Sequence, residues 1–257
     1  MNSQESVEAW LKKQGYPLEM RTARAFSRRG WFLHHSRRYR DNVSGKDREI
    51  DLLAFCDDPS PKNGIHGHFV IECKWSQKKP WVLFTSEQQS LNSIGHVLST
   101  AMTSEMVSDA LLLDNAEIVR LPMFSDIREG YGIVQAFAKD QAIDAAHTAV
   151  VTVSNAANFF AKDMSGQGHS IFFIPTVVFE GELFSCSLDG DANVVVKPLE
   201  IGVLLHTSTD DEGSNRGRSL VHIVRESALE MFIDRAEATF ERIRRFLRPD
   251  STGTSIG

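Results

Sequence analysis

Two apolar runs on either side of a loop rich in proline and glycine constrain the fold of this chain most strongly. Their sequences are REIDLLAFC (48–56) and HFVIECKW (68–75), and DDPSPKNGIHG (57–67) joins them. Alternation of apolar and polar residues, clearest in the second run, is typical of half-buried strands, and the joining residues favour a turn. The pattern therefore predicts two adjacent strands that pair in the antiparallel, hairpin-like sense.

This pairing places polar side chains close together. Asp51 lies early in the first run, whereas Glu72 and Lys74 lie late in the second, on the face opposite Phe69, Ile71 and Cys73. In an antiparallel pair the start of one strand meets the end of the other, so we expect all three polar groups to converge. A solvent-facing ion pair between Glu72 and Lys74 is the alternative interpretation.

The surrounding sequence predicts further elements in a recognisable order. Before the two strands we expect helices at 3–14 and 18–30, a strand at 31–39 and a turn at 40–47; after them we expect a short extended piece at 81–84 and a helix at about 87–113 capped by Ser86. Beyond residue 115 the composition predicts mostly helix at 130–162, two strands joined around Gly181 within 170–188, more strand at 193–207, a loop at 209–218, a strand at 220–224 and a helix at 226–247.

The chain has 257 residues, 42% of them hydrophobic and 24% charged, which indicates a globular protein with a sizeable core. With no repeat and no low-complexity linker, we expect one extended domain: a core at 1–115, an α+β extension at 116–247 packed on the same sheet, and a disordered tail at 248–257. Three widely spaced cysteines, Cys56, Cys73 and Cys186, suit a reducing cytoplasm. No signal peptide or membrane span is expected.

Charge is distributed unevenly along the chain. Residues 12–48 contain eleven Lys or Arg against three acids, a net charge of +8, and because the whole chain has −6 the remainder has −14. A basic segment of this kind can meet a polyanion such as DNA. The candidate phosphate-binding residues are Arg37, Arg38, Arg40, Lys46 and Arg48. A solvated strand end is an equally good interpretation of these residues.

Two carboxylates and an ammonium group suit metal-assisted hydrolysis of a phosphodiester. Asp51 and Glu72 offer the oxygen ligands that Mg²⁺ prefers, with Mn²⁺ as a substitute. The ion would neutralise phosphate charge and lower the pKa of a bound water. Lys74 would position or deprotonate that water or stabilise charge in the transition state.

The EID of residues 49–51 and the ECK of residues 72–74 resemble the bipartite motif of the PD-(D/E)xK nuclease superfamily. The helix–strand–strand–strand–helix order also matches that restriction-endonuclease-like core. The pattern LE…A…RRGW, REIDLLAF, FVIECK is similar to the Holliday-junction-resolvase, Mrr-like and RecB-like branches. The resemblance covers roughly residues 15–113. It implies a mixed α/β sheet, and it implies that Glu19 on the preceding helix assists Asp51, Glu72 and Lys74 and that Gln88 or Gln89 is an auxiliary residue.

The sequence departs from the family pattern at one motif position, where Ile50 replaces the proline, and the region after 115 matches no family. Glu19 also suits a first-turn acid favoured by the helix dipole. His34, His35, His66 and His68 lack the spacing of a metal site, and Trp75 and Trp81 are expected to pack in the core.

The resemblance implies a Mg²⁺-dependent nuclease that acts on DNA in restriction, phage defence or repair. Two alternatives stay open: a catalytically inactive DNA-binding or assembly subunit, and an RNA-directed nuclease. A homodimer and a partner subunit within a larger complex are both compatible with the sequence.

Overall fold

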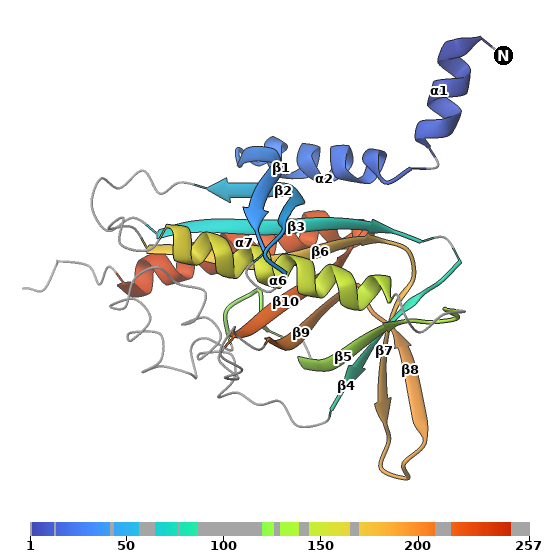
Figure 1. Ribbon diagram of the computed structural model, residues 1–257. Coiled ribbons are helices and arrows are strands. Elements are labelled where there is room, and N and C mark those ends of the chain that lie inside the picture. Colours follow the sequence, from blue (N-terminus) through green and yellow to red (C-terminus); the bar gives the residue numbers. More distant parts are fainter. Residues whose placement is uncertain are drawn as a thin grey trace, which may run out of the picture.

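The computed structural model of the protein describes residues 2–12, 14–41, 44–56, 65–76, 78–86, 120–125, 129–138, 144–164, 170–208 and 217–247. These residues form an α/β fold around a mixed sheet (Figure 1). Its helices are α1 (Ser3–Leu11), α2 (Tyr16–Arg28), α6 (Ala145–Asp163) and α7 (Leu229–Leu247), the last preceded by a 3₁₀ turn at Glu226–Ala228. Its strands are β1 (Phe32–Arg40), β2 (Asp47–Cys56), β3 (Ile65–Trp75), β4 (Trp81–Thr85), β5 (Glu129–Gln135), β6 (Ser170–Glu180), β7 (Leu183–Leu188), β8 (Val194–Pro198), β9 (Ile201–Ser208) and β10 (Gly217–Arg225).

The ten described strands follow the spatial order β1-β2-β3-β6-β10-β9-β5-β4-β7-β8. Strands β1, β2 and β3 are antiparallel to their neighbours within that group, whereas β3 and β6 are parallel, as are β6 and β10. The sheet is larger than the predicted core, and strands from before and after residue 115 share it. A division into units at residue 115 stays a prediction.

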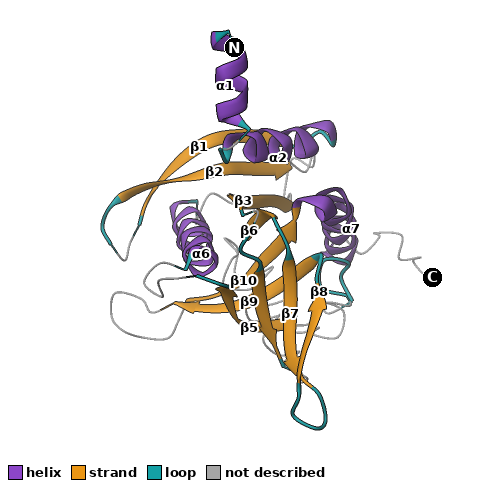
Figure 2. Cartoon of the chain, turned by 90° about the vertical axis from the view of Figure 1, so that its right-hand side faces the viewer, coloured by secondary structure: helices purple, strands orange, loops and turns teal. Residues whose placement is uncertain are grey.

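Helices cover both faces of the sheet (Figure 2). On one face, side chains of α2 and α7, among them Phe26 and Phe232, enclose Phe69 of β3. On the other face α6 packs through small and aromatic residues, such as Ala157 and Phe160, against β2, β3 and β6. Strand β3 is therefore buried on both sides, which fixes the side chains it carries.

Most predicted elements occur near their expected positions. β3 begins at Ile65, so the predicted loop at 57–67 is too long by three residues, and the extended stretch at 193–207 is two strands, β8 and β9. The helix at 87–113, its cap at Ser86, and the tail at 248–257 were also predicted; residues 87–119 and 248–257 lie outside the described part of the chain.

The helical prediction for 130–162 is wrong at its beginning. Residues 129–135 form the strand β5. Gly130 lets β5 pack closely on the neighbouring β4, because a Cβ there would lie 2.5 Å from Cδ1 of Leu83. The helix itself begins only after Asp144, whose side chain accepts hydrogen bonds from the backbone N–H of Ala146 and His147.

Candidate functional site

The antiparallel pairing of β2 and β3 places Asp51 beside the end of β3. Leu52 lies opposite Ile71 in the register, and Oδ2 of Asp51 accepts a hydrogen bond of 2.7 Å from the backbone N–H of Cys73. Burial is the main cause that raises the pKa of Asp51, while the Cys73 hydrogen bond and Lys74 act in the opposite direction. The expected proximity of Asp51 to the ECK sequence is confirmed.

Glu72 and Lys74 form an ion pair, but it is not the solvent-facing pair of the alternative interpretation. Glu72 is only 8% exposed, and its second oxygen, Oε2, is buried with no hydrogen-bond partner among the residues that the structure describes. Burial and the negative charge of Asp51 raise the pKa of Glu72 to about 7, although Lys74 opposes them. A buried carboxylate with one unsatisfied oxygen is costly, which is more typical of a binding site than of a structural ion pair.

Lys74 carries its positive charge in this setting. Burial acts to lower the pKa of its ammonium group, but the charges of Glu72 and Asp51 outweigh burial and raise it. Lys74 is therefore an ammonium ion at neutral pH.

Helix α2, which precedes the motif in the chain, adds a third carboxylate, Glu19. Glu19 lies in the first turn of α2 and is half-buried. Its pKa is raised by burial and then by Asp51, while Lys74 lowers it. Glu19 thus belongs to the same electrostatic cluster, although its position also suits the helix dipole, so both interpretations hold.

Glu49 is a member of this cluster that the sequence reasoning missed. Its charge raises the pKa of both Asp51 and Glu19. Glu49 lies two residues before Asp51 on β2. Side chains two residues apart on a strand point to the same face, and this pattern could have identified Glu49 from the sequence.

The carboxylates fit a hard divalent cation held by two protein ligands. Oε2 of Glu72 has no hydrogen-bond partner in the described part of the chain, and one oxygen of Asp51 is not engaged by Cys73. Within the described residues no group of three His, Cys, Asp or Glu side chains is arranged to hold a metal ion. Mg²⁺ is commonly bound by one or two carboxylates together with water and substrate phosphate, so two ligands suffice.

The five candidate phosphate-binding residues differ in their partners. Arg48 contacts the buried Asp41 at 2.6 Å, and Arg40 contacts Asp47 at 3.3 Å. Arg37 and Arg38 are exposed on β1, and neither has an ion pair with any described residue; Lys46 is also exposed. The structure therefore leaves Arg37, Arg38 and Lys46 as the better candidates.

Tyr39, which lies between two of these arginines, and the two tryptophans have structural surroundings, and two predicted glutamines lie outside the described part. Tyr39 is buried and donates a hydrogen bond to the carbonyl of Thr152, so it is not available to a phosphate. Trp81 is buried and stacks on Phe179 at 4.1 Å, as expected, whereas Trp75 is 37% exposed. The auxiliary candidates Gln88 and Gln89 lie outside the described residues.

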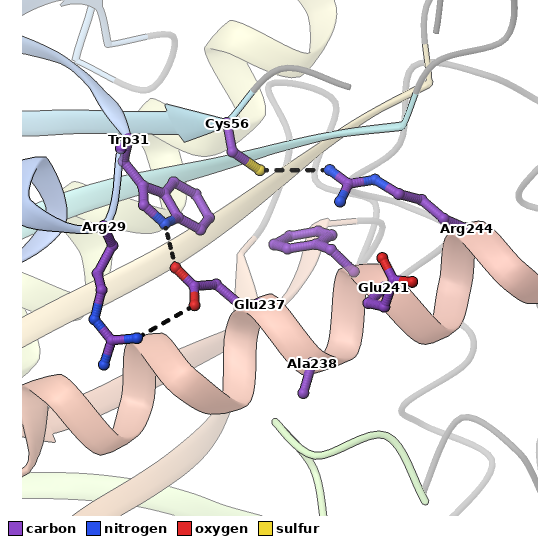
Figure 3. Close-up of a pocket in the computed structure, with 9 residues that line it drawn as sticks. Arg29, Trp31, Cys56, Glu237, Ala238, Glu241 and Arg244 are labelled. Atoms are coloured by element: carbon purple, nitrogen blue, oxygen red, sulfur yellow. Dashed lines mark hydrogen bonds and ion pairs between the residues drawn. The ribbon is translucent and has the colours of Figure 1, made fainter. Parts of the chain in front are cut away.

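A separate cavity of about 400 Å³ lies between the start of β1, the end of β2 and α7 (Figure 3). Several of its charged side chains contact residues of its own wall. Glu237 accepts hydrogen bonds from Trp31 and Arg29, and Arg244 donates to the Sγ of Cys56. Cys56 is the last residue of β2, five residues beyond Asp51, and no residue of the carboxylate cluster lines the cavity.

No described helix is both long enough and apolar enough to span a membrane. Comparison of the chain with protein-family models, curated proteins and solved structures finds no match in any of the three.

Proposed function

We propose that this chain is a Mg²⁺-dependent nuclease of the PD-(D/E)xK type, built on a restriction-endonuclease-like core, that hydrolyses DNA phosphodiester bonds. The observation that carries the proposal is Glu72: a buried carboxylate with one unsatisfied oxygen, paired to Lys74 and adjacent to Asp51. The element order α2-β1-β2-β3, whose elements carry this cluster, supports the same assignment. Its setting would be restriction, phage defence or DNA repair in the cytoplasm.

In this proposal Asp51 and Glu72 hold the cation, with Mn²⁺ able to replace Mg²⁺. The ion supplies charge neutralisation at the phosphate and an activated water. Asp51 is held in place by the Cys73 N–H, and Glu72 by the Lys74 ammonium, so neither carboxylate needs to reorganise on binding.

The charge state of Lys74 narrows its role. Its pKa is raised by Glu72 and Asp51, and its ammonium group already pairs with Glu72, which favours a hydrogen-bond donor over a proton acceptor. Its ammonium group would instead donate a hydrogen bond to the attacking water or to a phosphate oxygen as negative charge develops. Glu19 would contribute negative charge and orient water beside Asp51.

Incubation of plasmid, linear and single-stranded DNA, and of RNA, with Mg²⁺, Mn²⁺ or EDTA tests the proposal. We expect DNA cleavage that EDTA abolishes, that Lys74→Ala removes, and that Lys197→Ala on the distant β8 leaves unchanged. Equal cleavage by wild type and Lys74→Ala would refute the assigned site. Cleavage of RNA alone would favour the RNA-directed alternative, and DNA binding without cleavage would favour an inactive binding subunit.

A further inference from the structure

Three aromatic rings stack across the outer strands of the sheet, at a place that the proposed chemistry does not use. Phe32 of β1 stacks on Phe55 of β2 with 5.5 Å between ring centroids and 25° between planes. His34 stacks on the same Phe55 at 5.2 Å and 22°. The series continues inward from Phe55 to the buried His68 at 5.2 Å.

The outer rings of this stack face solvent. Phe32 is 57% exposed and His34 is also exposed, because β1 is the terminal strand of the described sheet (Figure 2). Elsewhere in the sheet Trp81 and Phe179 stack in the core, whereas Phe84 of β4 stacks on Tyr131 of β5, which is 69% exposed. Cross-strand packing alone does not require an exposed phenylalanine on a sheet edge, where apolar surface is a liability.

The same strand carries positive charge and no acid. β1 has the sequence FLHHSRRYR, and its arginines Arg37 and Arg38 are exposed without an ion pair to any described residue. Aromatic rings followed by unpaired arginines along one exposed strand are the combination that proteins use to hold single-stranded nucleic acid.

The candidate site lies level with the middle of this strand. His35 pairs with Leu52 and Arg37 with Ile50, so Ser36, whose φ is 53°, falls level with Asp51. From Phe32 to Arg37 the strand spans about 16 Å at the usual rise per residue. A ligand lying along β1 would therefore meet the rings before it reaches the level of Asp51 and then Arg37 and Arg38, whose side chains leave the strand on opposite faces.

We propose that β1 binds a single strand of DNA, with an unpaired base on the exposed rings of Phe32 and His34 and phosphates on Arg37 and Arg38. This rests on the proposed nuclease function and assigns its substrate class. A single strand fits because its bases expose their faces to an aromatic ring, whereas the bases of a duplex are already stacked on one another.

Binding measured without turnover separates this inference from the nuclease proposal. A fluorescein-labelled single-stranded DNA of mixed sequence, the matched duplex and the matched RNA are titrated with protein in EDTA, and fluorescence anisotropy is followed. The variants are Phe32→Ala, Phe32→Trp and Phe137→Ala, the last a control because Phe137 is 80% exposed after β5, far from β1 in the sheet order.

We expect the single-stranded DNA to bind more tightly than the duplex. Phe32→Ala should weaken that binding about tenfold, the order expected for loss of one stacked base, while Phe32→Trp and Phe137→Ala retain it. Equal binding by wild type and Phe32→Ala, or tighter binding of duplex or RNA, would overturn the inference and leave a metal-dependent cleavage activity standing. Cleavage of duplex DNA without any preference for single strands would do the same, whereas absence of both cleavage and binding would remove the nuclease proposal itself.

Discussion

The side chain of Asp51 accepts a hydrogen bond from the backbone N–H of Cys73, at 2.7 Å, and so joins β2 to β3 beside Glu72. This one contact gives Asp51 a structural and a chemical role. Substitution by asparagine can separate the two roles, because its amide oxygen can accept the same hydrogen bond but carries no negative charge.

Asp51→Asn should therefore fold as stably as wild type and lose metal-dependent cleavage. Asp51→Ala should lose cleavage as well, and its free energy of unfolding should fall by about 1–3 kcal/mol because the buried Cys73 N–H is left without a partner. Urea unfolding and a cleavage assay on the same samples test this. Full activity of Asp51→Asn would exclude Asp51 as a metal ligand.

Glu72→Gln should remove a pH dependence of stability. The folded pKa of Glu72 is about 7, above its ordinary value of 4.5, so the native state retains a proton that the unfolded chain releases between those values. The stability from Glu72 is thus complete below pH 4.5 and is lost as the pH rises through 7. Relative to wild type, Glu72→Gln should gain about 1–3 kcal/mol between pH 5 and 8. Parallel curves for the two proteins over this range would contradict the assignment.

Substitutions of the arginines should divide into two classes. Arg48→Ala removes the guanidinium that lies 2.6 Å from the carboxylate of Asp41, which is only 5% exposed, and should reduce the free energy of unfolding by about 1–2 kcal/mol. Arg37→Ala and Arg38→Ala should leave stability unchanged but weaken DNA binding, and each should reduce the slope of log affinity against log salt by about 1. Arg40→Ala, whose pair with Asp47 is exposed, serves as the control for stability. The same loss of unfolding free energy in Arg48→Ala as in Arg37→Ala and Arg38→Ala would refute this division.

Local sequence patterns predicted the part of the site that is formed by strands close together in the sequence. Alternation in 48–56 and 68–75 fixes the β2–β3 pairing, and with it the proximity of Asp51 and Glu72. The parallel pairing of β3 with β6 joins residues about a hundred positions apart, and no local pattern encodes such a partner. Burial of Glu72, which raises its pKa, depends on that partner and on α6.

The sequence-based predictions that were wrong or missing also have physical causes. Residues 129–135 lacked a strong strand pattern, and Gly130 is explained only by the approach of Leu83. The arginines of residues 37–48 look alike in sequence, yet Asp41 folds back to bind Arg48 and leaves Arg37 exposed. The stack of Phe32, His34 and Phe55 required the β1–β2 register, which the sequence alone did not supply.

Close packing between Gly67 of β3 and Phe240 of α7 leads to a further prediction, about the stability of the hydrophobic core. A Cβ at this position of β3 would lie 2.2 Å from Cζ of Phe240 on α7. Gly67→Ala should therefore cost about 2 kcal/mol or more of unfolding free energy through overpacking. Combined with Phe240→Leu, the loss should be smaller than the sum of the two single losses, and a double-mutant cycle in urea measures that difference. Additive losses would mean that Phe240 does not occupy the space beside Gly67.

Acid sensitivity should arise from His222 on β10. This residue is 1% exposed and packs between Phe124 and Phe232, with ring centroids at 5.6 and 5.3 Å. Burial lowers its pKa from 6.5 to about 4, although the backbone of Met123 acts in the opposite direction. Below pH 6.5 the imidazole of His222 therefore binds a proton in the unfolded chain, whereas in the native state it does so only near pH 4. The free energy of unfolding is lost as the pH falls through this range.

For His222 we expect this loss to approach about 3 kcal/mol at pH 4, and His222→Leu should abolish it while keeping an apolar side chain of similar size. Urea unfolding at half-unit steps from pH 7 to 4 measures the difference between the two proteins. Glu72 changes stability in the opposite sense over part of the same range, and subtracting the variant's curve from that of wild type isolates the histidine. A constant difference between the two curves from pH 7 to 4 would show that His222 is protonated as easily in the folded protein as in the unfolded chain.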